Sequence, residues 1–422
     1  MSAPIAAAIR RDIPGRFNEL DILRRHRDRY TAAMKGHNVP PHEVMIHGSS
    51  VCNLTCDWCI GDHVPMTSTN GSGQTIVISA AKTEETILPD GLRDPGAMAR
   101  LASQIINFKR VVPTDNGDQV FGIETVNFSG LIGEPLVNRA SLIPAIKMLN
   151  DAGLRTGIFT NGILIGDKDL EVMARMGFVH VSMDAATGDT YAKLKYSGKP
   201  QGVHLFKKAL ESIRRLRDAK DAAGTDLQIS VGFIVYPGNF EEVYESARQA
   251  KERGAMTFKI KRDISCLRLL DAHQRSVCAR LIDRIEDELA DETFEVLRIH
   301  DVEAEATTRR QFDSCRITKL MASIGSDGNM YPCNYHPRPG AAHYGSVIED
   351  SLEEVWDGTA RSSMMPTLPQ ICPPTCDPFK GRSNTLFQTI EMRRSEVGDI
   401  QVDAEIDEII ESGAYRVRHI TE

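Results

Sequence analysis

The chain has 422 residues, of which 41% are hydrophobic and 26% are charged, a composition typical of a globular protein with room for two or three domains. Its formal net charge of -8 gives no reason to expect a nucleic acid or an anionic membrane as a partner. It has no apolar run near the roughly 18 residues that span a bilayer. A secretory signal requires basic residues before its apolar run, but the arginines of "MSAPIAAAIRRD" come after it. We therefore expect a cytoplasmic protein.

The first 42 residues read as a polar, partly helical lead-in. The periodic stretch "FNELDILRRHRDRYTAAMKG" predicts helix, and Pro40 and Pro41 end it. A Gly/Ser/Thr-rich insertion at 61–92 then interrupts the chain as a surface excursion or lid. A helix is expected to begin after it, with Asp94 as N-cap and Pro95 at the first helical position.

Strands and helices alternate through the middle of the chain, which predicts parallel strands joined by crossover helices. Six strand–helix units favour an open sheet or partial barrel over a closed eight-unit barrel. The predicted strands lie in residues 43–50, 120–130, 154–162, 178–185, 226–239 and 256–263. Besides the helix that begins at Asp94 and Pro95, the predicted helices lie in 141–153, 168–177, 204–224, 240–254 and 271–292. The fold class is therefore α/β, a partial (β/α)6 TIM-like barrel.

The pattern changes after about residue 305. A β-hairpin is expected to turn at Asp327-Gly328, and "SLEEVWDGTARSSMM" predicts a helix. An acidic helix, "DAEIDEIIESG", reads as a solvated surface near the end. We divide the chain into a lead-in, a partial barrel, a small α+β domain and a helical tail, at 1–42, 43–305, 306–385 and 386–422.

Nine cysteines in a chain without an export signal favour metal or redox chemistry over structural disulfides. Three form a C-x₃-C-x₂-C run after the first predicted strand: Cys52, Cys56 and Cys59. Four follow the barrel: Cys315, Cys333, Cys372 and Cys376. Two readings of the first group are open from the residues alone. Cys56 and Cys59 could join Cys372 and Cys376 in a four-thiolate zinc site, or the three thiols could hold a four-iron cluster with one iron left for an exogenous ligand.

Other distinctive residues follow the ends of successive strands, where active sites lie in parallel α/β folds. They occur in "SGLIGEPL" after strand two, "TNG" after strand three, "SMDA" at the end of strand four, and on strand six. Each alone has an ordinary interpretation as a turn, a helix cap or a solvated charge. Their order along the strands favours one shared site.

The C-x₃-C-x₂-C run with Trp58 before its last cysteine resembles the radical S-adenosylmethionine superfamily, and the likeness extends over residues 43 to about 305. "IGEP" resembles that family's glycine-glycine-glutamate motif, with Ile132 at the usual first glycine. The resemblance implies S-adenosyl-L-methionine (SAM) contacts from Trp58, Gly133, Glu134, Asn161, Ser182, Asp184 and Arg262.

For the cysteine run, the resemblance implies a SAM-binding 4Fe-4S cluster on Cys52, Cys56 and Cys59. The open iron chelates SAM, and the reduced cluster cleaves it to methionine and a 5′-deoxyadenosyl radical, which abstracts hydrogen from unactivated carbon. An external electron donor of flavodoxin or ferredoxin type is implied as a partner.

The later cysteines resemble the SPASM/twitch extension of the same superfamily. Four cysteines instead of seven favour the shorter twitch form, with one auxiliary 4Fe-4S cluster on Cys315, Cys333, Cys372 and Cys376. Zinc on four thiolates is the alternative that the residues leave open.

Cys266 follows strand six and is a candidate catalytic residue, because epimerases of the family use a cysteine to return hydrogen to a substrate radical. The alternative is that Cys266 packs as a small hydrophobe, as Cys278 is expected to do in its amphipathic helix.

The sequence thus predicts a radical SAM oxidoreductase. We expect a small-molecule substrate, a polar metabolite such as an aminosugar or aminocyclitol, because the lead-in is short for a leader-peptide recognition domain. The alternatives are an epimerase using Cys266, a peptide-modifying maturase and, from another class, a non-catalytic iron–sulfur electron carrier.

Overall fold

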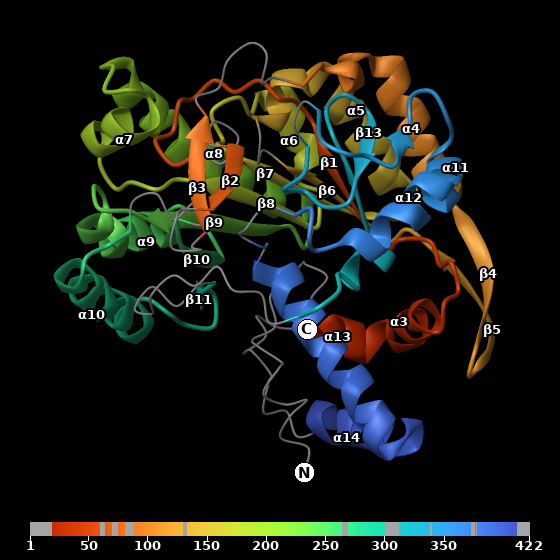
Figure 1. The fold of residues 1–422 in the computed structure, drawn as a ribbon. Helices are drawn as coiled ribbons and strands as arrows, with labels where there is room; N and C mark the ends of the chain where they lie inside the picture. Colours follow the sequence, from red (N-terminus) through yellow and green to blue (C-terminus); the bar gives the residue numbers. More distant parts are fainter. Residues whose placement is uncertain are drawn as a thin grey trace.

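The computed structural model describes residues 19–59, 64–69, 75–80, 88–129, 133–263, 269–299, 312–337, 340–372, 376 and 378–411. Figure 1 shows a sheet covered by helices, with a smaller helical layer below it that contains both α3 and α13.

The central sheet has ten strands in the order β11-β10-β9-β8-β7-β6-β1-β12-β13-β14. All six predicted strands are present in it and pair in parallel, so the α/β partial-barrel prediction is confirmed. They are β1 (Glu43–His47), β6 (Thr125–Ser129), β7 (Arg155–Thr160), β8 (Phe178–Ser182), β9 (Gln228–Val235) and β10 (Thr257–Arg262). A seventh parallel strand, β11 (Glu295–Arg298), adds to β10 and was not predicted.

The segment after the barrel extends the same sheet. Strand β12 (Met321–Ile324) pairs in parallel with β1, so the barrel and the later cysteine region share a continuous set of backbone hydrogen bonds. The predicted hairpin is confirmed, with β13 (Asn329–Tyr331) antiparallel to β12 and Gly328 at φ 83° in the turn, where a side chain would be strained. Strand β14 (Gly345–Ser346) forms the edge.

Helices cover the sheet as the strand–helix alternation predicts (Figure 1). Valine, isoleucine, leucine and phenylalanine from the strands and helices form one continuous buried cluster. The barrel helices are α4 (Pro95–Asn107), α5 (Arg139–Asp151), α6 (Asp167–Met173), α7 (Gly188–Lys195), α8 (Gln201–Ala223), α9 (Val243–Glu252) and α10 (Ala272–Glu288), with short 3₁₀ turns at Gly91–Arg93, Pro135–Asn138 and Phe240–Glu242.

A second core lies between the two ends of the chain. The lead-in forms α2 (Glu19–Arg25) and α3 (Arg27–Met34), which pack against α13 (Pro378–Val397) and α14 (Asp399–Glu411). The ring of Tyr30 stacks on Phe387 with centroids 4.5 Å apart. The predicted tail boundary at 385/386 therefore falls inside α13. The acidic helix α14 is also more than a solvated surface, because Val402, Ile406 and Ile409 are buried.

Several elements differ from the prediction because tertiary pairing overrides local pattern. The segment predicted as one strand from 120 contains a turn: β4 (Lys109–Thr114) and β5 (Gly117–Gly122) form a separate hairpin before β6. The polar insertion after the cysteines contains a second hairpin, β2 (Val64–Thr69) with β3 (Thr75–Ala80). The helix expected at Ser351 is two helices, α11 (Leu352–Asp357) and α12 (Thr359–Met364), with 3₁₀ turns at Ile317–Lys319 and Met365–Thr367 nearby. Among the residues described, no helix is long and apolar enough to cross a membrane.

The predicted N-cap of α4 is confirmed, since the Asp94 carboxylate accepts a hydrogen bond of 2.7 Å from the backbone N–H of Ala97. We expect Asp94→Ala to lower the free energy of unfolding by about 1 kcal/mol, the usual cost of an N-cap. Urea unfolding measures this, with the exposed Asp118→Ala as the control for loss of a carboxylate. Equal effects of the two substitutions would contradict a capping role.

Candidate active site

Five strands and the cysteine loop converge on one cavity of about 240 Å³. The loop reaches it from the end of β1, and the opposite walls come from the carboxyl ends of β6 to β10. The residues that line it are Cys52, Leu54, Cys56, Trp58, Cys59, Ser129, Gly133, Glu134, Phe159, Thr160, Asn161, His180, Ser182, Asp184, Lys195, Ile234, Lys261 and Asp263. The structure thus brings the three thiols and the predicted strand-end residues, apart from Arg262, to a single place.

The cysteine loop is held by backbone hydrogen bonds to the end of α7. The N–H groups of Thr55 and Asp57 donate to the carbonyl oxygens of Lys195 and Leu194, each at 3.0 Å. The ring of Trp58 packs against Leu194 and lies 5.0 Å from the ring of Tyr236. These contacts fix the loop without using its cysteine side chains.

Gly133 lies directly against the cysteine loop. A Cβ atom added there would come within 2.3 Å of the carbonyl oxygen of Ser49 and 2.8 Å of that of Val51. Only glycine allows this approach, which explains the glycine of the predicted "GEP" motif in physical terms.

Glu134 is buried and ties the loop to the end of β7. Its backbone N–H donates to the Val51 carbonyl at 2.9 Å, and its carboxylate accepts from the Thr160 hydroxyl at 2.6 Å and from the Asn161 N–H at 2.8 Å. Burial raises the pKa of Glu134 despite these bonds. The Asn161 amide donates in turn to the Asn53 side chain at 2.7 Å.

Asp184 forms a buried ion pair with Lys195, a residue that the sequence did not single out. The Lys195 ammonium lies 2.8 Å from the carboxylate and also donates to the Ser182 carbonyl at 2.7 Å. The other carboxylate oxygen accepts from the Ile234 N–H at 2.8 Å, and Asp184 has φ 58°. Burial works to lower the pKa of Lys195, but the Asp184 carboxylate and other nearby groups outweigh it and the pKa is raised.

The predicted residues of the sixth barrel strand lie at the end of β10, and only some of them line the cavity. Lys261 and Asp263 line the cavity, and the predicted Arg262 lies between them at the end of β10. The Lys261 ammonium is 3.4 Å from the imidazole of His180, which the sequence analysis also did not name. Cys266 lies outside the described residues, as does Ile132.

The chemistry of this donor set suits a metal cluster. The three thiols face a common cavity, and burial raises the pKa of the Cys56 thiol well above its ordinary value. A thiolate is therefore stable there only beside a compensating cation, as in an iron–sulfur cluster.

Side-chain nitrogens lie beside three of the four later cysteine sulfurs. The imidazole of His336 is 3.4 Å from the sulfur of Cys372. The other two contacts are from Lys380 to Cys333 at 3.6 Å and from Asn384 to Cys315 at 3.4 Å. These three side chains are buried. The N–H groups of Lys380 and Asn384 stabilise negative charge on sulfur, as such groups do around iron–sulfur clusters.

Two further observations test whether the later cysteines fit a buried cluster. The buried hydroxyl of Tyr344 has no hydrogen-bond partner in the part of the chain that the structure describes. The pKa of Tyr344 is raised by burial and further by the nearby Cys315, Cys333 and Cys372. The fourth thiol, Cys376, lies 3.7 Å from where a Cβ atom at Gly381 would be. A cluster bound here would offer sulfur acceptors to the orphaned hydroxyl, so the site and the group fit.

Sequence comparison decides the family. The model of the radical SAM superfamily matches residues 46–250, and that of an iron–sulfur cluster-binding domain, SPASM, matches residues 315–377. This chain is a radical SAM enzyme with a SPASM domain. The predicted cofactors, SAM and 4Fe-4S clusters including an auxiliary one, are those of this family. No curated protein gives a significant sequence match to the chain.

Solved radical SAM structures have a similar fold. SuiB of Streptococcus suis bound to S-adenosylmethionine is 17% identical, with a TM-score of 0.53 over 82% of this chain and 74% of that chain. The structure of SuiB bound to precursor peptide SuiA also gives 0.53, with 75% of that chain covered. Histidine-tagged anSMEcpe with bound AdoMet is 13% identical, with a TM-score of 0.50 over 85% of this chain and 99% of that chain.

His47 lies near both cysteine regions of this radical SAM enzyme. It ends β1, five residues before Cys52, and its register partner is Ser129 of the cavity wall. The imidazole is buried, and neither ring nitrogen has a hydrogen-bond partner among the described residues. Burial and then the nearby Lys380 lower the pKa of His47 to about 3.

We expect Lys195→Met to destabilise the protein by about 3–5 kcal/mol, because it leaves the Asp184 carboxylate buried without its counterion. Urea unfolding is the measurement, and the exposed Lys193→Met on the same helix is the matched control with little expected effect. Adding Asp184→Asn to Lys195→Met should recover part of the loss. If both lysine variants unfold alike, the ion pair does not support the site.

The buried His47 predicts a loss of stability in acid. Its folded-state pKa of about 3 lies below the ordinary 6.5, so the unfolded state binds the proton more readily and stability falls as pH drops below 6.5. The loss is about 1.4 kcal/mol per pH unit, or about 2 kcal/mol at pH 5. Urea unfolding at pH 7.5 and pH 5 should show a weaker pH dependence for His47→Leu than for the wild type. An unchanged pH dependence in the variant would contradict this assignment.

Proposed function

We propose that this radical SAM enzyme modifies a peptide substrate, and that Cys52, Cys56 and Cys59 hold its SAM-binding cluster. The observation that carries the cluster assignment is that all three thiols line the cavity that Glu134 and Asn161 also line. With Trp58, Gly133, Ser182 and Asp184, these residues form the proposed SAM site, and Arg262 is proposed to act from its edge.

When bound, SAM and the reduced cluster supply a 5′-deoxyadenosyl radical, which removes hydrogen from unactivated carbon. The chain's own contribution is positioning. The Gly133 backbone lets the motif approach the cysteine loop, and Glu134 is fixed by bonds to that loop and to the end of β7, so that its carboxylate needs no reorganisation. Phe159, Ile234 and Trp58 add apolar walls that exclude water from the reacting atoms.

We assign the auxiliary 4Fe-4S cluster to Cys315, Cys333, Cys372 and Cys376. Four protein thiolates would leave no iron of this cluster open, so the cluster would supply an electron acceptor or conduit. The N–H groups of Lys380 and Asn384 beside the sulfurs would favour its reduced, more negative state. An acceptor next to the barrel suits a net oxidation of the substrate, and an external flavodoxin or ferredoxin would supply the electron that starts each turnover.

A peptide substrate is favoured over the small polar metabolite predicted from the sequence. The support is the similarity of fold to SuiB, whose structure was solved with precursor peptide SuiA. The short lead-in, which suggested a metabolite, is weaker support than this similarity of fold, because a leader-recognition domain can also be a separate protein.

The cluster assignment predicts the activity of cysteine variants. Anaerobically reconstituted wild type should contain about eight irons and should release 5′-deoxyadenosine when given SAM and dithionite. Cys56→Ala should lose about half the iron and all 5′-deoxyadenosine formation, whereas Cys278→Ala, a buried thiol of α10, should keep both. A non-catalytic electron carrier would form no 5′-deoxyadenosine even as wild type, and normal activity of Cys56→Ala would refute the assignment.

The substrate class is tested separately. Peptides encoded beside the gene for this enzyme, and a panel of aminosugars and aminocyclitols, are each incubated with reconstituted enzyme, SAM and dithionite. We expect a peptide to raise 5′-deoxyadenosine formation and to change in mass, by loss of two hydrogens if the net reaction is an oxidation. Stimulation by a small metabolite alone would overturn the peptide proposal, and an unchanged mass with inverted stereochemistry would favour epimerisation.

A further inference from the structure

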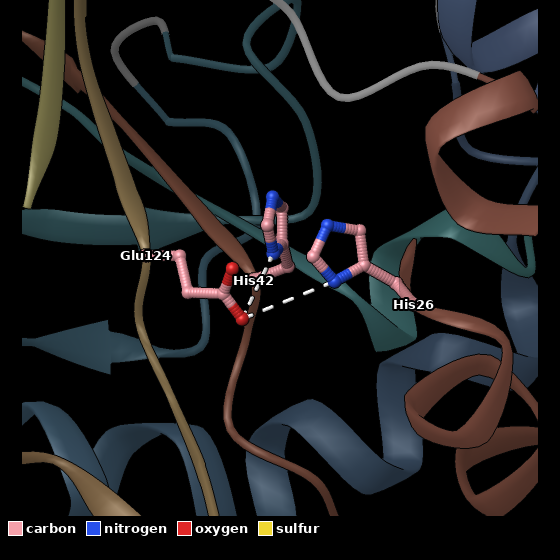
Figure 2. Close-up of side chains that lie close together, drawn as sticks. All are labelled: His26, His42 and Glu124. Carbon is pink, nitrogen blue, oxygen red and sulfur yellow. Dashed lines mark ion pairs between the residues drawn. The ribbon is translucent and has the colours of Figure 1, made fainter. Parts of the chain in front are cut away.

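A second group of metal-ligand side chains lies away from the cavity, at the opposite ends of the barrel strands. His26 stands between α2 and α3, His42 directly precedes β1, and Glu124 directly precedes β6. Their ligand atoms all lie within 4.8 Å of one another. Figure 2 shows both imidazoles turned toward the same carboxylate oxygen of Glu124.

The spacing of these side chains is close to that of ligands around one ion. The Nδ1 atoms of His26 and His42 are 3.9 and 3.6 Å from Oε1 of Glu124. Two ligands on a tetrahedral ion with bonds of about 2.0–2.1 Å stand roughly 3.4 Å apart. Small shifts of the three side chains would therefore bring them to bonding distance of one cation.

The surrounding structure positions His42 and Glu124 before any ion binds. The backbone N–H of Glu124 donates to the His42 carbonyl at 3.0 Å, and the N–H of His42 donates to Leu320 at 2.7 Å. The buried Arg29 donates to Oε1 of Glu124, the oxygen that the two imidazoles face, at 2.7 Å and to the Gly122 carbonyl at 2.8 Å. An ionised carboxylate has lone pairs for both an arginine and a metal, and such supporting bonds are typical around metal ligands.

The site has an entry path and space for another ligand. The same three side chains line an open cavity of about 700 Å³, whose other walls include Arg25, Lys109 and Arg155. These cationic groups, with Arg29, oppose the approach of a bare cation but favour an anionic fourth ligand, such as hydroxide or chloride, on a bound metal. Two imidazoles and one carboxylate favour zinc over magnesium or calcium, which prefer all-oxygen ligands.

We propose that His26, His42 and Glu124 bind a divalent zinc-class cation, with water or a small anion as the fourth ligand. The ion links the lead-in helices to the segments that enter β1 and β6. It is a structural site, separate from the cysteine sites, and the ion takes no part in the proposed catalytic reaction.

The test uses the full chain with its iron–sulfur clusters reconstituted. Zinc is added, loosely bound metal is removed by gel filtration, and zinc and iron are counted by mass spectrometry. We expect about one zinc per wild-type chain, at least about tenfold weaker zinc affinity in His26→Gln and Glu124→Gln, and unchanged iron in all. His204→Gln, an exposed histidine on α8, is the matched control and should bind zinc as the wild type does.

X-ray absorption at the zinc edge provides a second readout. It is measured on the wild type, so it does not depend on whether a variant folds. A shell of nitrogen and oxygen at about 2.0 Å with imidazole scattering is expected. A sulfur shell at about 2.3 Å would place the zinc on cysteines and overturn the proposal. Absence of zinc from the wild type, or equal affinity in the wild type and the ligand variants, would overturn it as well.

Discussion

The buried ion pair between Lys195 and Asp184 is the interaction on which the geometry of the active site depends most. It joins the end of α7 to the end of β8, and the second carboxylate oxygen holds the Ile234 N–H of β9. The cysteine loop bonds through its backbone to the same end of α7. Since a buried charge without its partner costs several kcal/mol, this pair fixes the loop relative to the strand ends. The ion pair therefore acts on the cysteines indirectly, through the backbone of residues 194 and 195.

The second constraint is the continuous sheet that links the two cysteine regions. Strand β1 leads into the first cysteine loop, and β12, its parallel neighbour, follows Cys315 and leads through the hairpin to Cys333. The two proposed clusters are thus held beside neighbouring, hydrogen-bonded strands of one sheet. His47 lies in this region, close enough to Lys380 for the lysine charge to affect its pKa.

Much of the fold follows from local pattern, because strand–helix alternation, the Asp94 N-cap and the Asp327-Gly328 turn are determined by residues close in sequence. Elements that depend on distant partners were missed. Strand β11 has only four residues and is defined by its pairing with β10, and α7 lies in a short polar stretch without a clear apolar period. Lys195 looks like an ordinary helical lysine until the fold buries it beside Asp184. In the same way, His26, His42 and Glu124 are far apart in sequence, so no spacing rule could identify them as a group.

The central claim is that Cys52, Cys56 and Cys59 hold a cluster with one iron open to SAM. Electron–nuclear double resonance of the reduced enzyme, with SAM labelled with ¹⁵N at its amino group, tests it most directly. The account predicts a coupling between the labelled nitrogen and the cluster that is lost in Cys56→Ala and kept in a variant lacking Cys372 and Cys376. A wild-type enzyme whose reduced clusters show no coupling to the label, or a coupling that survives in Cys56→Ala, would contradict it.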